Sequence, residues 1–229
     1  MKVFAILLAC ACAFSGAAHA ALIATVDLDL PGGSTGTVGP VGATPSPNND
    51  NSTGPSPNVV PYVIFLNSPG AFESVFTVTN SAGRTEYAFA QTLVNNSGAS
   101  WTGFRFEIGF GRGPAFLVSS LPDDLDFDAP TFDPFPVASA LSVVATQPDV
   151  LQWSGGTVIP VGTSTFSFSI DVPDGLSQWH PDGLNAFTLR QVPVIASVVP
   201  EPATLVLLLV AGVVACVGQV RARKSCDPR

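Results

Sequence analysis

Cysteine is absent from the central part of the chain. All four cysteines lie near the ends, at Cys10, Cys12, Cys216 and Cys226, so residues 21–199 contain none. This absence excludes a disulfide-stapled fold, a thiol nucleophile and a cysteine-zinc site in that region. The same region holds fourteen phenylalanines, three tryptophans and two tyrosines. Burial of these side chains must therefore provide its stability.

Positive charge and histidine are scarce in the same region. Residues 21–199 carry four arginines and no lysine against fifteen aspartates and glutamates, which is a net charge of −11. Nucleic acid binding requires a basic face, so this balance argues against a nucleic acid partner. His180 is the one histidine here, which rules out a metal site with two histidine ligands. Its setting between Trp179 and Pro181 is typical of a surface turn.

A sustained helical period is also missing between residues 59 and 199. Apolar and polar residues alternate with period two, in runs separated by Gly, Pro and Asn, which is typical of strands. The runs cover residues 22–30, 59–66, 72–79, 87–94, 104–110, 165–170 and 187–192. We therefore predict an all-β fold, an antiparallel β-sandwich of the jelly-roll or immunoglobulin-like Greek-key type. Pro61 lacks a backbone donor, so the run 59–66 is expected at a sheet edge.

Residues 31–58 have a composition unlike the rest. Gly, Pro, Ser, Thr and Asn make up 24 of these 28 residues. Such a segment buries too little apolar surface to offset the entropy lost on ordering. We expect residues 21–30 to form a first strand, 31–58 a loop or linker, and 59–192 the main sandwich domain.

The C-terminal segment carries a sorting and membrane pattern. Val199, Pro200, Glu201 and Pro202 end a stalk over 193–202, and the apolar run 203–220 is about 27 Å long as a helix, close to the thickness of a bilayer core. The tail 221–229 then begins with the basic residues Arg221, Arg223 and Lys224. By the positive-inside rule, this tail lies in the cytoplasm and the bulk of the chain outside.

The N-terminal segment has the features of a secretory signal peptide. Lys2 precedes the apolar run 3–14, and Ala18 and Ala20 occupy the small-residue positions of a cleavage site. We expect export by the Sec translocon, removal of residues 1–20 by signal peptidase, and a mature chain that begins at Ala21.

The order of Pro-Glu-Pro box, apolar span and basic stop resembles the PEP-CTERM sorting signal of Gram-negative bacteria. The resemblance implies an inner-membrane intermediate, which an exosortase-like enzyme processes near the box. It also implies delivery to the cell surface or extracellular matrix, where proteins with this tail are associated with exopolysaccharide and biofilm. A non-catalytic surface protein is the function that it favours.

An acidic run is the strongest candidate for metal binding. Strand alternation would place Asp124, Asp126 and Asp128 on one side, where their oxygens could hold Ca²⁺. The alternative is an acidic strand whose carboxylates stay hydrated while Leu125 and Phe127 enter the core. No other cofactor is expected.

Two further functions remain open from the sequence. Exposed Trp101, Trp153 or Trp179 could stack on sugar rings in a carbohydrate-binding module, although packing in the core is the commoner use of tryptophan. A sandwich-fold glycoside hydrolase would instead need two carboxylates about 5–10 Å apart in one cleft.

Overall fold

The computed structural model describes residues 21–41, 56–80, 83–132 and 134–195. The expected signal peptide, the Pro-Glu-Pro box, the apolar run 203–220 and the basic tail lie outside these ranges. Within the described ranges, no helix is long and apolar enough to cross a membrane.

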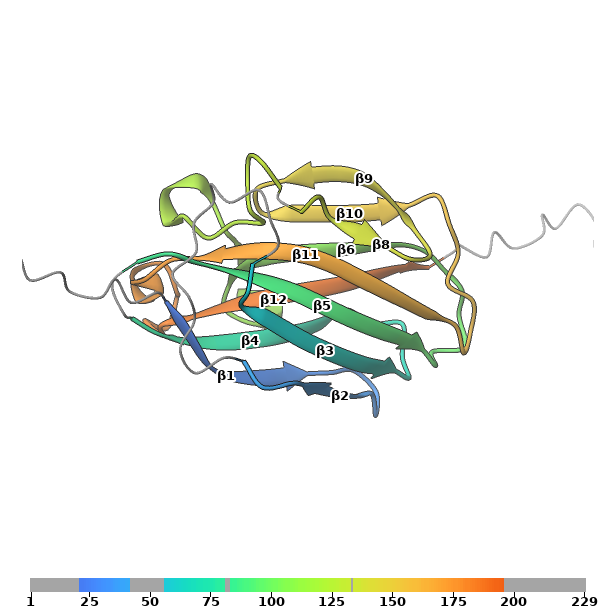
Figure 1. The fold of residues 1–229 in the computed structure, drawn as a ribbon. Helices are drawn as coiled ribbons and strands as arrows, with labels where there is room; N and C mark the ends of the chain where they lie inside the picture. Colours follow the sequence, from blue (N-terminus) through green and yellow to red (C-terminus); the bar gives the residue numbers. More distant parts are fainter. Residues whose placement is uncertain (1–20, 42–55, 81–82, 133, 196–229) are drawn as a thin grey trace, which may run out of the picture. The chain divides into compact units, whose positions relative to one another are not determined.

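Two β-sheets make up the described chain (Figure 1). Sheet A contains, in spatial order, β1 (Leu22–Asp29), β4 (Phe72–Thr79), β12 (Ala186–Ile195), β6 (Trp101–Phe110), β10 (Val150–Ser154) and β9 (Ser142–Gln147), with β7 (Leu117–Val118) paired to β6. Sheet B contains β2 (Thr35–Val38), β3 (Val59–Leu66), β5 (Thr85–Asn95), β11 (Thr163–Val172) and β8 (Val137–Ala138). Three short 3₁₀ helices lie in the connections: η1 (Gly113–Ala115), η2 (Leu121–Asp123) and η3 (Leu176–Gln178). The predicted all-β sandwich is confirmed.

The core lies between the two sheets. Each strand directs alternate side chains inward, and these are the apolar members of the period-two runs. Phe76 of sheet A meets Phe89 of sheet B edge-on, with ring centroids 5.5 Å apart. Phe106 contacts Phe166 at 5.2 Å in the same way. Burial of these rings holds the sheets together, because each aromatic side chain removes a large apolar area from water.

The edge position expected for residues 59–66 is wrong. The strand β3 lies inside sheet B, paired with β2 on one side and with β5 on the other. The pairing with β5 is parallel, so sheet B is mixed rather than antiparallel. The backbone of Pro61 faces the β2 side of the strand, where its carbonyl accepts a hydrogen bond from the Gly39 N–H at 2.7 Å. Pro61 is tolerated there because β2 ends at Val38, one residue before Gly39. The backbone N–H that proline lacks would therefore lie beyond the end of β2, where no strand pairing requires it.

The pairing strand β2 lies within residues 31–58, the segment expected to be a loop. Thr35–Val38 makes an antiparallel ladder with residues 62–65 of β3. A four-residue edge strand is held mainly by backbone hydrogen bonds, so its polar composition does not prevent pairing. The first strand, expected over 22–30, is present as β1.

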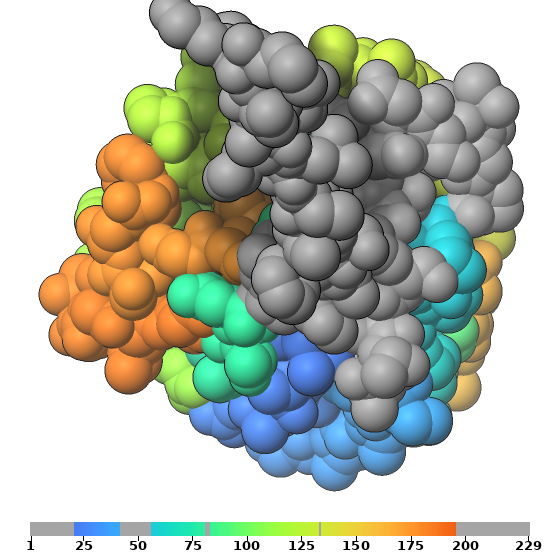
Figure 2. All heavy atoms as spheres, turned by 60° about the vertical axis from the view of Figure 1, so that its left-hand side comes forward, coloured from blue at the N-terminus to red at the C-terminus, as the bar shows by residue number. Residues whose placement is uncertain are grey.

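The loop after β6 folds back over the outer face of sheet A. Gly109 pairs with Val118 of β7, and a Cβ on this glycine would lie 2.0 Å from the Leu117 carbonyl oxygen. The close approach therefore requires glycine. At the end of the sandwich shown in Figure 2, the β11–β12 connection with η3 (orange) forms part of the surface.

Candidate functional site

The loop between β7 and β8 carries the acidic run and is pinned to the sandwich. Asp123 accepts hydrogen bonds from the Ser119 hydroxyl at 2.6 Å and from the backbone N–H of Ser120 at 2.8 Å. Leu125 and Phe127 are buried in the core, as the sequence predicts. These anchors fix the positions of the aspartates between and after them.

The structure does not gather Asp124, Asp126 and Asp128 on one side of a strand. Asp124 and Asp128 have φ of 57° and 48°, in the left-handed region, so the backbone turns at both residues and strand alternation is lost. The Asp124 carboxylate points outward, 3.3 Å from the Arg84 guanidinium. Asp126 accepts from the Ala129 N–H at 2.8 Å. The predicted metal triad is therefore wrong as a set.

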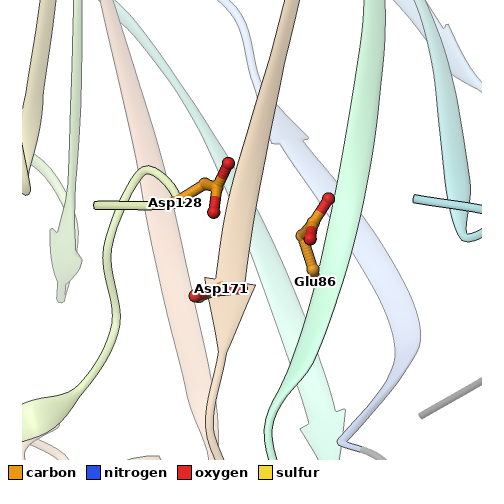
Figure 3. Close-up of side chains that lie close together, drawn as sticks. All are labelled: Glu86, Asp128 and Asp171. Atoms are coloured by element: carbon orange, nitrogen blue, oxygen red, sulfur yellow. The ribbon is translucent and has the colours of Figure 1, made fainter. Parts of the chain in front are cut away.

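Asp128 instead joins two acidic residues from sheet B (Figure 3). Glu86 of β5 and Asp171 of β11 are directly paired across the two strands, and both side chains point out of the core into the space covered by the loop. One carboxylate oxygen from each of Glu86, Asp128 and Asp171 lies within 4.8 Å of those of the other two. All three residues are almost completely buried. We refer to these three residues as the carboxylate cluster.

Burial controls the protonation of this region. It raises the pKa of Asp171 to about 7, and the nearby Asp126 carboxylate adds to the rise, while the Arg84 guanidinium opposes it. Burial also raises the pKa of Asp126 to about 6, against the Ala129 N–H and Arg84. The carboxylates of Asp126 and Asp171 thus share the nearby Arg84, and the negative charge of each disfavours ionisation of the other.

Neighbouring polar groups orient the Glu86 side of the cluster. The Ser169 hydroxyl donates to Glu86 Oε1 at 3.2 Å. The Glu86 backbone carbonyl accepts from the Ser56 hydroxyl at 2.7 Å and from the Asn58 amide at 3.0 Å. These contacts fix the backbone of β5 where Glu86 leaves it.

A second polar site lies on the outer face of sheet A. The side chain of Arg190 on β12 makes two hydrogen bonds to Glu73 Oε1, at 2.6 and 2.8 Å, and its Cζ lies 3.9 Å from the centre of the Phe116 ring. Glu73 Oε2 accepts from the Gly113 N–H at 2.8 Å. The ion pair therefore ties η1 and the residues around it to the sheet.

A cavity of about 420 Å³ opens beside this ion pair, and we call it the outer-face cleft. Asp29, Glu73, Arg190 and Glu107 occupy one transverse row of sheet A, on β1, β4, β12 and β6. All four line the cleft, together with the apolar residues Pro31, Ala71, Phe72 and Val192. Glu107 also pairs with Arg105 at 2.6 Å. The cleft thus combines charged hydrogen-bonding groups with an apolar lining.

The three tryptophans are not a sugar-binding surface. Trp101 and Trp153 are fully buried, where Trp153 packs edge-on against Phe106. Trp179 alone is partly exposed, at 36%. His180 beside it begins the predicted turn, in which the Gly183 N–H donates to the His180 carbonyl at 2.9 Å, but its side chain is buried and its Nδ1 accepts from the Asp182 N–H at 3.1 Å. Both residues follow η3.

Glu86 and Asp171 are not predicted from the sequence as partners of Asp128. Both stand on the polar side of an alternating run, so each looks like an ordinary solvent-facing residue. Only the register of β5 against β11, which pairs Glu86 directly with Asp171, shows that the two carboxylates are neighbours. Comparison with protein-family models, with curated proteins and with solved structures finds no match to this chain.

Proposed function

We propose that the chain is an exported, non-catalytic protein of the cell surface or extracellular matrix, whose sandwich binds polysaccharide through the outer-face cleft. Export, membrane anchoring and exosortase-type processing rest on the sequence pattern of the two ends. Binding rests on the arrangement of Glu73, Arg190 and Glu107.

The sandwich fits a jelly roll better than an immunoglobulin-like key. Three strand pairs are nested: β4 pairs with β12, β5 with β11 and β6 with β10. The chain also changes sheets at each step from β4 to β6 and again from β10 to β12. A long hairpin rolled into two sheets produces this order, and lectin domains are among the jelly rolls.

The contacts of Glu73 carry the argument for binding over catalysis. Its carboxylate accepts two hydrogen bonds from Arg190 and a third from the Gly113 N–H. Charge-assisted donors of this kind hold a carboxylate in one orientation. A glycosidase needs one carboxylic acid that can give a proton to the leaving oxygen, whereas a carboxylate already oriented by three protein donors is suited to accept a sugar hydroxyl.

The volume and chemistry of the cleft suit a short stretch of a saccharide. Ligand sites of about 300–1,000 Å³ commonly combine an apolar lining with a few oriented polar groups. Arginine and carboxylate side chains supply both donors and acceptors, as a polyhydroxylated ring requires. The apolar side chain of Val192, which is half-buried beside Arg190, can meet the carbon face of such a ring.

Glycan-array binding of the full-length chain in detergent tests this proposal. We expect binding that is about tenfold weaker for Arg105→Gln and for Glu107→Gln, because each removes a hydrogen-bonding group of the cleft or its immediate partner. Arg112→Gln is the matched control, since this arginine makes a surface pair with Asp27 on the same sheet. Wild-type protein that binds no glycan would overturn the binding proposal. Release of shorter sugars from a bound glycan would identify a hydrolase instead.

The sorting part of the proposal has its own test. We expect the intact mass of the protein from cells with the sorting enzyme to correspond to a chain that begins at Ala21 and ends near Pro200–Pro202. Without the enzyme, the chain should keep residues 203–229 and remain in the membrane. Full-length protein in the cytosol would contradict export.

A further inference from the structure

We infer that the carboxylate cluster of Glu86, Asp128 and Asp171 is a site for a hard divalent cation, Ca²⁺ by its ligand chemistry. The distances permit one ion to reach all three residues. Calcium lies about 2.3–2.6 Å from each oxygen, so two ligand oxygens on opposite sides of it are about 5 Å apart. The three oxygens lie within 4.8 Å of one another, inside that limit. Figure 3 shows them converging from two strands and the covering loop.

The Asp171 carboxylate supplies an independent indication of a ligand. This side chain is fully buried, and its Oδ2 lies 3.4 Å from Arg84 Nη1. Its Oδ1 has no hydrogen-bond partner among the described residues. A buried acceptor without a partner costs free energy, more so when it carries charge. A cation bound to the cluster would remove that cost.

Among the described residues, the carboxylates at the cluster outnumber the arginine that lies beside them. Glu86, Asp128 and Asp171 lie together, and Asp126 is bridged to Asp171 by backbone hydrogen bonds. Arg84 is the guanidinium that opposes them, and it is shared with the exposed Asp124. A divalent cation would bring the region close to neutrality, which buried carboxylates require if they are to stay ionised.

The donor set determines the class of metal. All three ligands are carboxylates, and no His or Cys of the described residues belongs to the cluster. Oxygen-only sites suit calcium and magnesium, whereas zinc and copper favour nitrogen and sulfur. Calcium accepts irregular geometry and six to eight oxygens, which three carboxylates and water can supply. Magnesium demands a near-ideal octahedron, which ligands from two strands and a loop are less suited to form.

The position of the cluster indicates what the ion would do. Asp128 belongs to the loop between β7 and β8, whereas Glu86 and Asp171 belong to β5 and β11. An ion bound to all three would fasten the loop to the outer face of sheet B. Binding to the folded state alone would stabilise the sandwich in proportion to the logarithm of the calcium concentration. This inference does not depend on polysaccharide binding.

Calorimetry and thermal unfolding of the full-length chain in detergent, stripped of metal and titrated with CaCl₂ alone, test the inference. We expect a binding isotherm with a Kd between about 10⁻⁷ and 10⁻³ M, the range of calcium sensors and extracellular modules, and a rise in Tm that saturates. Asp171→Asn and Asp128→Asn should abolish both responses. Asp171→Asn removes a buried charge, so it should fold at least as stably as the metal-free wild type.

Asp124→Asn is the matched control, because its carboxylate is an exposed neighbour outside the cluster. It should keep the full response to calcium. Absence of binding up to about 10 mM CaCl₂, beyond the weakest extracellular calcium modules, would overturn the site. A calcium response that survives Asp171→Asn would place the ion elsewhere and also overturn it. Binding of MgCl₂ without binding of CaCl₂ would refute the assignment to calcium.

Discussion

Gln91 and Gln191 are joined by a hydrogen bond between the two sheets: Nε2 of Gln91 lies 2.6 Å from Oε1 of Gln191. They stand on β5 and β12, and both side chains are almost completely buried. Gln91 Oε1 and Gln191 Nε2 have no hydrogen-bond partner within the described ranges. The pair therefore places a polar contact, only partly satisfied, between two sheets whose facing side chains are mainly aromatic and aliphatic.

Replacing one glutamine should cost more than replacing both. Gln91→Leu removes the donor to the buried Gln191 Oε1, so we expect it to lower the free energy of unfolding by about 1–3 kcal/mol. The double variant with Gln191→Leu removes both polar groups and should be close to the wild type. Urea unfolding of the single and double variants measures this. Strictly additive losses would show that the hydrogen bond contributes nothing.

The Glu73–Arg190 ion pair should contribute to stability, in contrast to surface pairs. Glu73→Gln leaves a largely buried guanidinium beside a neutral amide, so we expect a loss of about 2–4 kcal/mol in the free energy of unfolding. The matched control is Arg112→Gln, which breaks an exposed pair with Asp27 and should change stability by less than about 1 kcal/mol. Equal effects in urea unfolding would contradict this prediction.

The titration of Asp171 should lower the free energy of unfolding of the metal-free protein as the pH rises. Its pKa of about 7 in the folded state exceeds the ordinary value of 3.8, so the folded state holds the proton more tightly between these values. This contribution to stability is therefore present near pH 4 and is lost as the pH rises through about 7.

The Asp171→Asn variant isolates this effect, because it has no titrating group at that position. With a chelator present, the variant should gain stability relative to wild type as the pH is raised from about 4 to about 7. Asp27→Asn, at an exposed position, serves as the control. A stability difference that does not change with pH would contradict the raised pKa of Asp171.

A methyl group at Gly109 should displace β7. Its Cβ would lie 2.0 Å from the Leu117 carbonyl oxygen, a distance that the backbone can relieve only by moving. We expect Gly109→Ala to lower the free energy of unfolding by about 1–3 kcal/mol and to speed amide hydrogen exchange at Ser119, whose N–H donates to the Ile108 carbonyl of β6 at 2.9 Å. An unchanged exchange rate at this residue would show that β7 stays paired with β6 and would contradict the prediction.

The sequence predicts strands where one face is buried, and it fails where burial gives no signal. Phe104, Phe106 and Ile108 alternate with Arg105 and Glu107, and this run is β6 as predicted. The strand β2 was missed because Thr35–Val38 is short and polar and is held by its ladder to β3. That ladder is also the reason why β3 is not at an edge.

The site was harder to predict than the strands. The acidic run suggested a metal site, but alternation assumes an extended backbone, and the left-handed residues Asp124 and Asp128 break it. Asp128 does belong to the carboxylate cluster. Its partners, Glu86 and Asp171, are 42 and 43 residues away in opposite directions along the chain, and only the pairing of β5 with β11 brings them together.

The last strand of the sandwich lies in the middle of sheet A. Residues 186–195 form β12, which separates β4 from β6, and neither of those strands pairs with the other. Nearly the whole domain must therefore be synthesised before sheet A can be completed. Most paired strands are also far apart in the sequence, and such long-range pairing slows folding. The proposed export requires an unfolded chain, and such late closure would keep the chain competent for translocation until β12 has been synthesised.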